Sequence, residues 1–239
     1  MPISLDPPPI SPSVTASRPL AGMTVLVVED SRFASEAVRL LCLKSGARIR
    51  RADSLRAARR HLTGYVPTVL IVDLGLPDGS GLDLIKDMAA THDRIPVILA
   101  TSGDDRGFVE AIDAGADGTL LKPVESLMAF QTVVLNALPK DIRPDGLRLV
   151  SAEMIEPDRL AFQDDLSHIA DLLTTADDDE TVDYVAQFLT GVAKSAHDAP
   201  LEEAAVSLAS RRTAGASIRS DLARVAGLLQ ERIQTRAMI

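Results

Sequence analysis

The stretch at residues 69–73 places the strongest constraint on how this chain can fold. Four apolar residues, three of them β-branched, run directly into Asp73, and a loop rich in turn residues follows at residues 74–81. A short apolar run closed by turn residues predicts a strand buried on both faces, as in a parallel sheet. Open α/β sheets carry their chemistry at the carboxyl ends of the strands, where Asp73 would lie. Taken alone, Asp73 is explained equally well as a cap of the following turn.

Residues 24–138 alternate between strand-like segments and segments with helical spacing. Strands are predicted at residues 24–28, 47–52, 69–73, 95–100 and 118–121, and helices at residues 31–44, 54–62, 81–90, 104–114 and 125–138. This alternation predicts an α/β fold with a doubly wound, five-stranded parallel sheet and helices on both faces. Because the strands run parallel, all of them would end at one edge of the sheet.

Five polar residues end or follow these strands, namely Glu29, Asp30, Asp73, Thr101 and Lys122. Three carboxylates at one edge repel one another, and oxygen ligands suit Mg²⁺, which keeps several waters and bridges to phosphate. Asp73 is then a candidate nucleophile that forms an aspartyl phosphate. Lys122 would neutralise the transferring group, and the Thr101 hydroxyl would donate to it. The alternative is a charge cluster that only holds the loops together.

Several sequence stretches around these residues point to a known family. They read VLVVEDS at residues 25–31, VDLGLPDGSG at 72–81, ATS at 100–102, AGADG at 114–118 and KP at 122–123. In their order and context, these stretches make residues 22–138, about half of the chain, similar to the receiver domain of bacterial two-component response regulators. The resemblance implies the flavodoxin-like form of the doubly wound sheet.

The resemblance also implies a chemical role for each residue of the cluster. Asp73 would accept a phosphoryl group from a partner histidine kinase or histidine phosphotransfer protein, and Thr101 and Lys122 would contact that group. The implied Mg²⁺ ligands are Glu29, Asp30, Asp73 and the backbone carbonyl of Gly75.

Two further features follow from the resemblance. It implies a cis bond between Lys122 and Pro123, which proline makes far less costly than it is elsewhere. Three residues before the lysine, where the family usually has an aromatic switch residue, this chain has Thr119. The usual ring rotation therefore cannot report phosphorylation, and the output surface is expected to differ.

The pattern changes to helices alone after residue 138, where prolines mark a boundary. Apolar stripes at helical spacing lie within residues 162–173, 182–192, 201–208 and 218–229. They predict four amphipathic helices that pack as an all-α bundle, in one chain or across a homodimer that would bury more apolar surface. The expected divisions are a disordered proline-rich arm at 1–21, the receiver at 22–138, a linker at 139–157 and a helical output or dimerisation domain at 158–239.

Three functions compete for the helical half. The first is a phosphorylation-controlled module that binds another protein or itself. The second is a histidine phosphotransfer or kinase-dimerisation-like bundle that uses His168, which points away from the apolar stripe with acids at i−4 and i+3. The third is a DNA-binding regulator, which the charge disfavours, because residues 140–239 contain eighteen Asp and Glu against eleven Lys and Arg. No motif there indicates an enzyme.

Composition limits the partners and the cellular compartment that fit this chain. The formal net charge of −9 argues against a nucleic-acid surface over the whole molecule. The single cysteine, Cys42, lies in a helical apolar pattern and is expected to be a buried thiol, which fits a reducing cytoplasm. The N-terminal segment lacks the pattern of a secretory signal, and no apolar run is long enough to span a bilayer.

Overall fold

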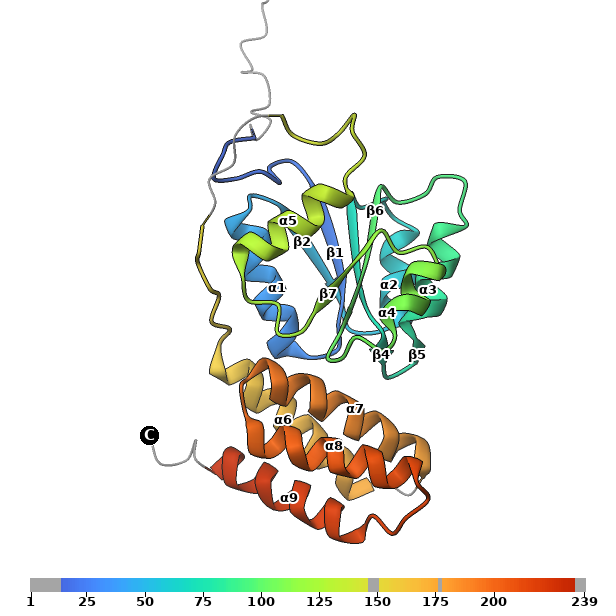
Figure 1. The fold of residues 1–239 in the computed structure, drawn as a ribbon, viewed down its shortest axis with the longest axis vertical. Helices are drawn as coiled ribbons and strands as arrows, with labels where there is room; N and C mark the ends of the chain where they lie inside the picture. The colour runs from blue at the N-terminus through green and yellow to red at the C-terminus, as the bar shows by residue number, and fades with distance from the viewer. Residues whose placement is uncertain (1–13, 146–150, 176–177, 235–239) are drawn as a thin grey trace, which may run out of the picture.

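The computed structural model describes residues 14–145, 151–175 and 178–234. Figure 1 shows two parts, an α/β part and a bundle of helices that lies against one end of it. The α/β part has a five-stranded parallel sheet of order β2-β1-β3-β6-β7. Its strands are β1 (Thr24–Val28), β2 (Arg48–Ala52), β3 (Val69–Asp73), β6 (Val97–Ser102) and β7 (Gly118–Leu121). The doubly wound parallel fold is therefore confirmed.

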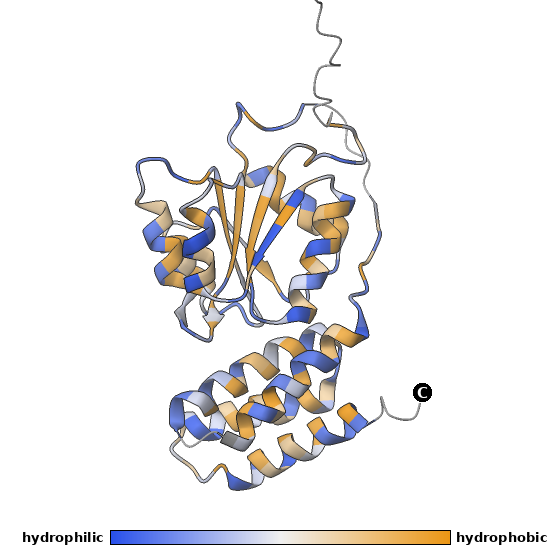
Figure 2. Cartoon of the chain, turned by 180° about the vertical axis from the view of Figure 1, so that it is seen from behind, coloured by the Kyte–Doolittle hydropathy of each residue, from blue (hydrophilic) through white to orange (hydrophobic). Residues whose placement is uncertain are grey.

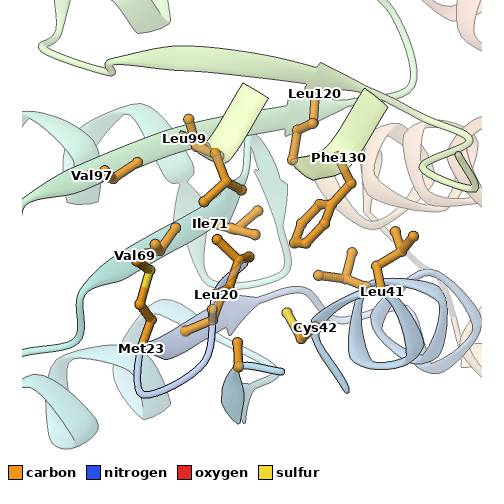
Figure 3. Close-up of a cluster of buried hydrophobic side chains, with 14 of the residues drawn as sticks. Leu20, Met23, Leu41, Cys42, Val69, Ile71, Val97, Leu99, Leu120 and Phe130 are labelled. Carbon is orange, nitrogen blue, oxygen red and sulfur yellow. The ribbon is translucent and has the colours of Figure 1, made fainter. Parts of the chain in front are cut away.

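The helices cover both faces of the sheet (Figure 1). One face carries α1 (Arg32–Lys44) and α5 (Leu127–Ala137), and the other carries α2 (Leu55–Leu62), α3 (Gly81–Ala89) and α4 (Phe108–Asp113). Alternate residues of each central strand point to opposite faces, so two apolar clusters form. Ile71 and Phe130 belong to the first (Figure 3), and Leu70 and Ile85 to the second. The central strands are accordingly hydrophobic along their length (Figure 2).

The main differences from the expectation in this part are two element starts and one added pair of short strands. Strand β6 begins at Val97 rather than at residue 95, after Pro96, which has no N–H for the ladder. Helix α4 begins at Phe108 rather than at residue 104, because the Asp104 carboxylate accepts from the Arg106 N–H and guanidinium in a turn. The expected loop at 74–81 contains a short antiparallel pair, β4 (Gly75–Leu76) and β5 (Gly79–Ser80).

The N-terminal arm is shorter than expected. Residues 1–13 lie outside the described residues, but residues 14–21 are folded onto the α/β part. Thr15 pairs with Arg18, and the Leu20 N–H donates to the Ser45 carbonyl at 2.9 Å. The Leu20 side chain is fully buried in the first apolar cluster. The expectation of disorder up to residue 21 is wrong for this stretch, since Leu20 and its neighbours Pro19 and Ala21 are buried.

The expected linker at 139–157 also contains a packed segment. Backbone bonds join Leu127 to Glu153 and Ile155 to Glu125, and the Ile155 side chain is buried in the first apolar cluster. The chain is therefore fastened to the α/β part just before the bundle begins. Residues 146–150 lie outside the described residues.

Four helices form the bundle, α6 (Arg159–Thr175), α7 (Asp179–Ser195), α8 (Ala199–Thr213) and α9 (Arg219–Gln234). All four contribute to one apolar core, with members such as Ile169, Leu189, Leu208 and Leu229. The predicted helical stripes are confirmed, and the bundle completes this core within one chain. None of the described helices is both long enough and apolar enough to cross a membrane.

The bundle packs on the edge of the sheet where the strands end. Helix α6 contacts α1, and α7 contacts both α1 and β4. In Figure 1 the bundle lies below this carboxyl edge, next to the β4–β5 pair and the first turn of α1. The bundle thus covers the edge of the sheet at which the sequence predicts the functional residues.

Candidate functional site

The strand ends bring the three predicted acids together. Asp73 is the last residue of β3, and Glu29 and Asp30 follow β1, which pairs with β3. One carboxylate oxygen from each residue lies within 4.8 Å of the others. Glu29 and Asp73 are buried and Asp30 is half-buried, so the cluster lies in a recess of the edge.

Lys122 supplies the positive charge of the cluster. It follows β7, is buried, and places Nζ 2.7 Å from Glu29 Oε2 and 3.0 Å from Asp73 Oδ1. Burial opposes the charged form, but the two carboxylates outweigh it and raise the pKa of Lys122, which stays an ammonium. The bond from Lys122 to Pro123 is cis, as the resemblance implied.

One lysine does not balance three carboxylates. Burial raises the pKa of Glu29 and Asp73 despite Lys122, and burial together with the Asp73 charge raises the pKa of Asp30 to about 7. Oxygen ligands with surplus negative charge are the donor set that Mg²⁺ prefers. The residues present therefore fit this ion. The Gly75 N–H donates a hydrogen bond to Asp73, so Gly75 lies next to the three carboxylates.

Thr101 lies opposite Asp73 in the parallel register of β3 and β6. Its side chain is buried, and its hydroxyl has no hydrogen-bond partner among the described residues. A buried hydroxyl without a partner is costly, so a polar group entering the recess would gain this donor. All five residues predicted from the strand ends therefore lie in one recess.

The bundle contributes residues that the sequence reasoning missed. The Tyr184 hydroxyl on α7 donates to Asp30 Oδ2 at 2.7 Å, and burial together with Asp30 raises the pKa of Tyr184. On α6, Asp165 is buried and accepts from Ser31 Oγ at 2.7 Å and from the Arg32 N–H at 2.9 Å. No local pattern could have identified these two residues, because each contacts a residue more than 130 positions away.

His168 is exposed on α6, as expected. It lines a groove between the two parts of the chain, and Glu29, Asp30 and Tyr184 line the same groove. Asp73 is not among the described residues that line it. Thr119, at the position of the usual aromatic switch, is half-buried on β7.

Comparisons with known proteins find matches to the α/β part of the chain. The response regulator receiver domain family matches residues 25–133. The virulence transcriptional regulatory protein PhoP of Salmonella typhimurium strain LT2 is 36% identical over 110 residues, which are 45% of this chain and 49% of the relative. The transcriptional regulatory protein PhoP of Escherichia coli strain K12 is 34% identical over the same shares.

A solved relative covers the same half. The CheY-like response regulator receiver domain from Methylobacillus flagellatus is 26% identical, covers 48% of this chain and 98% of that one, and gives a TM-score of 0.44. This chain spans about half the length of the curated relatives it matches. The family match ends at residue 133, before the bundle begins. Residues 25–133 are thus a response regulator receiver domain, here joined to a four-helix bundle.

Proposed function

We propose that this chain is a two-component response regulator in which Asp73 accepts a phosphoryl group from a histidine kinase or histidine phosphotransfer protein. Phosphorylation then switches the protein–protein interactions of the helical bundle. The observation that carries the proposal is the position of the Asp73 carboxylate, 3.0 Å from Lys122 and among the acids Glu29 and Asp30, inside a receiver domain.

The residues suggest how the transfer proceeds. An Asp73 oxygen attacks phosphorus, the P–N bond to the donor imidazole breaks, and the departing imidazole nitrogen takes up a proton. Lys122 leaves its pairing with the carboxylates to hold a phosphoryl oxygen, and the unpartnered Thr101 hydroxyl donates to another. Mg²⁺, held by Glu29, Asp30, Asp73 and the Gly75 carbonyl, would neutralise charge on the transferring group.

The test uses the full chain with Mg²⁺ and a small phosphodonor such as acetyl phosphate. We expect one labile phosphoryl group on Asp73 and none in Asp73→Asn. Undiminished label in Asp73→Asn would refute Asp73 as the acceptor. Asp78→Asn is a control for loss of one carboxylate outside the recess, since Asp78 bonds the first amides of α2 instead.

The same proposal assigns a role to each part of the chain. Residues 22–138 form the receiver, 139–157 connect the two parts, and 158–239 provide the output. The chain works in the cytoplasm, where its buried single thiol, Cys42, is compatible with reducing conditions. We assign it no enzymatic turnover and no membrane association.

Homodimerisation through the bundle remains a prediction. The reason for expecting it is weakened, because four helices of one chain already share an apolar core. Sedimentation of the full chain at tens of micromolar, an order-of-magnitude choice for a modest interface, tests it. A single monomeric species with and without phosphodonor would exclude it.

The DNA-binding alternative loses support in the bundle. The match to transcriptional regulators covers only the receiver half. Three of the basic side chains that would contact phosphates are engaged with acids, since Arg211 pairs with Asp221, Arg212 with Asp179 and Arg232 with Asp198. Cations already paired in this way gain little from a phosphate backbone.

A phosphotransfer role for His168 is the second candidate. The observation in its favour is its exposed position in the groove that Glu29 and Asp30 also line. Phosphohistidine is acid-labile and stable to base, which distinguishes it from aspartyl phosphate. Base-stable label in the wild-type chain that is lost in His168→Gln would establish this role, and its absence while Asp73 is fully phosphorylated would exclude it.

A further inference from the structure

One face of α7 crosses the opening of the phosphorylation site. Tyr184, Gln187, Gly191 and Lys194 are spaced by three, four and three residues, so they lie on one side of the helix. These four residues are called the α7 face below. Each contacts a loop that follows a strand of the sheet, and together they reach across the central strands β1, β3 and β6.

The first contact is with an acid of the site itself. The Tyr184 hydroxyl donates to Asp30 Oδ2 at 2.7 Å, while Asp30 Oδ1 accepts from the Ser31 N–H at 3.1 Å. Both oxygens of Asp30 are therefore engaged. A cation that takes Asp30 Oδ2 as a ligand competes with the Tyr184 hydroxyl for that oxygen.

In the middle of the α7 face, Gln187 lies against Gly75, which comes two residues after Asp73. A Cβ built on Gly75 would lie 2.1 Å from Gln187 Nε2, so the amide of Gln187 closely approaches the Gly75 backbone. Gln187 remains exposed to solvent on its other side. The approach depends on Gly75 having no side chain.

The far end of the α7 face is fastened to the loop after β6. Lys194 Nζ donates to the Gly103 carbonyl at 2.6 Å, and a Cβ built on Gly103 would lie 3.3 Å from the Gly191 Cα. Two glycines let the helix and the loop approach this closely. Gly103 comes two residues after Thr101, so this contact closes the site on the Thr101 side.

Access to Asp73 is consequently restricted. Asp73 is 6% exposed and Thr101 2%. Phosphoryl transfer requires the attacking and leaving atoms roughly in line, so the donor must occupy space directly outside the carboxylate. Helix α7 runs across that opening. None of the four members of the α7 face is a histidine, so the bundle occupies this opening without a group that could serve as a phosphohistidine donor.

We propose that the α7 face is a receiver-binding surface that competes with both Mg²⁺ and the phosphodonor for the phosphorylation site of its own chain. The bundle is then an intramolecular ligand of the unphosphorylated receiver domain. Asp30 would exchange the Tyr184 hydroxyl for Mg²⁺ when the ion binds, the phosphoryl group on Asp73 would need the room at Gly75, and α7 would then be released. This inference rests on the proposed function and names what phosphorylation switches.

The first test compares Tyr184→Phe with Tyr65→Phe in the full chain. Both remove one phenolic hydroxyl, but the Tyr65 hydroxyl is buried without a hydrogen-bond partner in the described parts of the chain. A hydrogen bond to a charged group contributes enough that Tyr184→Phe should bind Mg²⁺ about tenfold more tightly. Calorimetric titration at pH 8.5, where Asp30 is ionised, measures this. We expect Tyr65→Phe to match the wild type.

Phosphorylation kinetics provide a second readout. Tyr184→Phe should take up phosphoryl from acetyl phosphate about tenfold faster at low Mg²⁺, and Tyr65→Phe at the wild-type rate. Equal Mg²⁺ affinity in Tyr184→Phe and the wild type would overturn the inference. If no variant is phosphorylated while Tyr184→Phe still binds Mg²⁺ more tightly, the proposed function fails and the competition for the site stands.

Release of α7 can be followed directly. The chain has no tryptophan and two tyrosines, so Tyr65→Phe leaves Tyr184 as the only tyrosine. A phenol bonded to a carboxylate is quenched, and its emission should rise when Mg²⁺ and acetyl phosphate are added. The matched Tyr65→Phe/Asp73→Asn chain should show no phosphodonor-dependent rise. Unchanged emission in the phosphorylated Tyr65→Phe chain would show that α7 stays in place and would overturn the inference.

Discussion

Asp165 connects the bundle to the receiver domain, and its removal should weaken their docking. The residue lies on α6 and is 3% exposed. Its carboxylate accepts from Ser31 Oγ at 2.7 Å, from the Arg32 N–H at 2.9 Å and from the Phe33 N–H at 3.0 Å. It therefore supplies, from a distant helix, a negative charge at the N-terminus of α1, where the helix dipole favours it.

The magnitude follows from these contacts. In Asp165→Ala, two backbone N–H groups and one hydroxyl lose their acceptor while still buried. A bond to a charged group contributes about 1.5–3 kcal/mol and loss of a helix cap about 0.5–2 kcal/mol. Burial raises the pKa of Asp165, so part of this gain is offset by desolvation. We expect docking to weaken by about 2–3 kcal/mol, or roughly 30- to 150-fold.

The loss of docking free energy in Asp165→Ala has an upper limit. If the bundle departs, water satisfies the freed groups, so the penalty cannot exceed the free energy of docking itself. Asp165→Asn keeps one acceptor oxygen and should fall between the wild type and Asp165→Ala.

Hydrogen exchange at Ala34 provides the assay. Its N–H donates to Ser31 Oγ at 3.0 Å, an acceptor that the substitution leaves in place, so faster exchange reports opening of the interface. Asp164→Ala is the matched control, because the neighbouring Asp164 makes only an exposed ion pair with Arg32. Unchanged exchange in Asp165→Ala, or equal acceleration in Asp164→Ala, would refute the reasoning.

Three further predictions concern the receiver domain. Because the pKa of Asp30 is raised to about 7, a proton competes with Mg²⁺ below that pH, and apparent Mg²⁺ affinity should fall about tenfold or more per pH unit from 7 to 5; a flat calorimetric profile would contradict this. Burial raises the pKa of the Cys42 thiol to about 12. A thiol reagent at pH 8 should therefore modify the native chain at least about a hundredfold more slowly than the urea-unfolded chain. Comparable rates would show that Cys42 is accessible. Gly115 has φ +108° and a Cβ there would lie 2.5 Å from Ala89 Cβ, so Gly115→Ala should cost about 1–3 kcal/mol in urea unfolding, whereas Gly64→Ala, with only an ordinary contact, should cost far less.

The sequence alone determined the sheet and the principal residues of the site. The buried strands β1 and β3 are continuous apolar runs, and their local composition suffices to identify them. Once the strands are parallel, the polar residues at their ends have to converge, so the sequence predicts that Asp73 and Lys122 meet without any knowledge of side-chain contacts. The stripes of the bundle helices were readable for the same reason, since burial against neighbours imposes the helical period.

Tertiary structure decided where the bundle lies. Tyr184 and Asp165 look in the sequence like solvated residues on amphipathic helices, because a polar face has the same composition whether it meets water or another polar surface. Packing turns them onto Asp30 and the first turn of α1, more than 130 positions away. The anchoring of Leu20 is a smaller case of the same kind. Periodicity reports which face of an element is buried, and only the assembled chain determines what the remaining face touches.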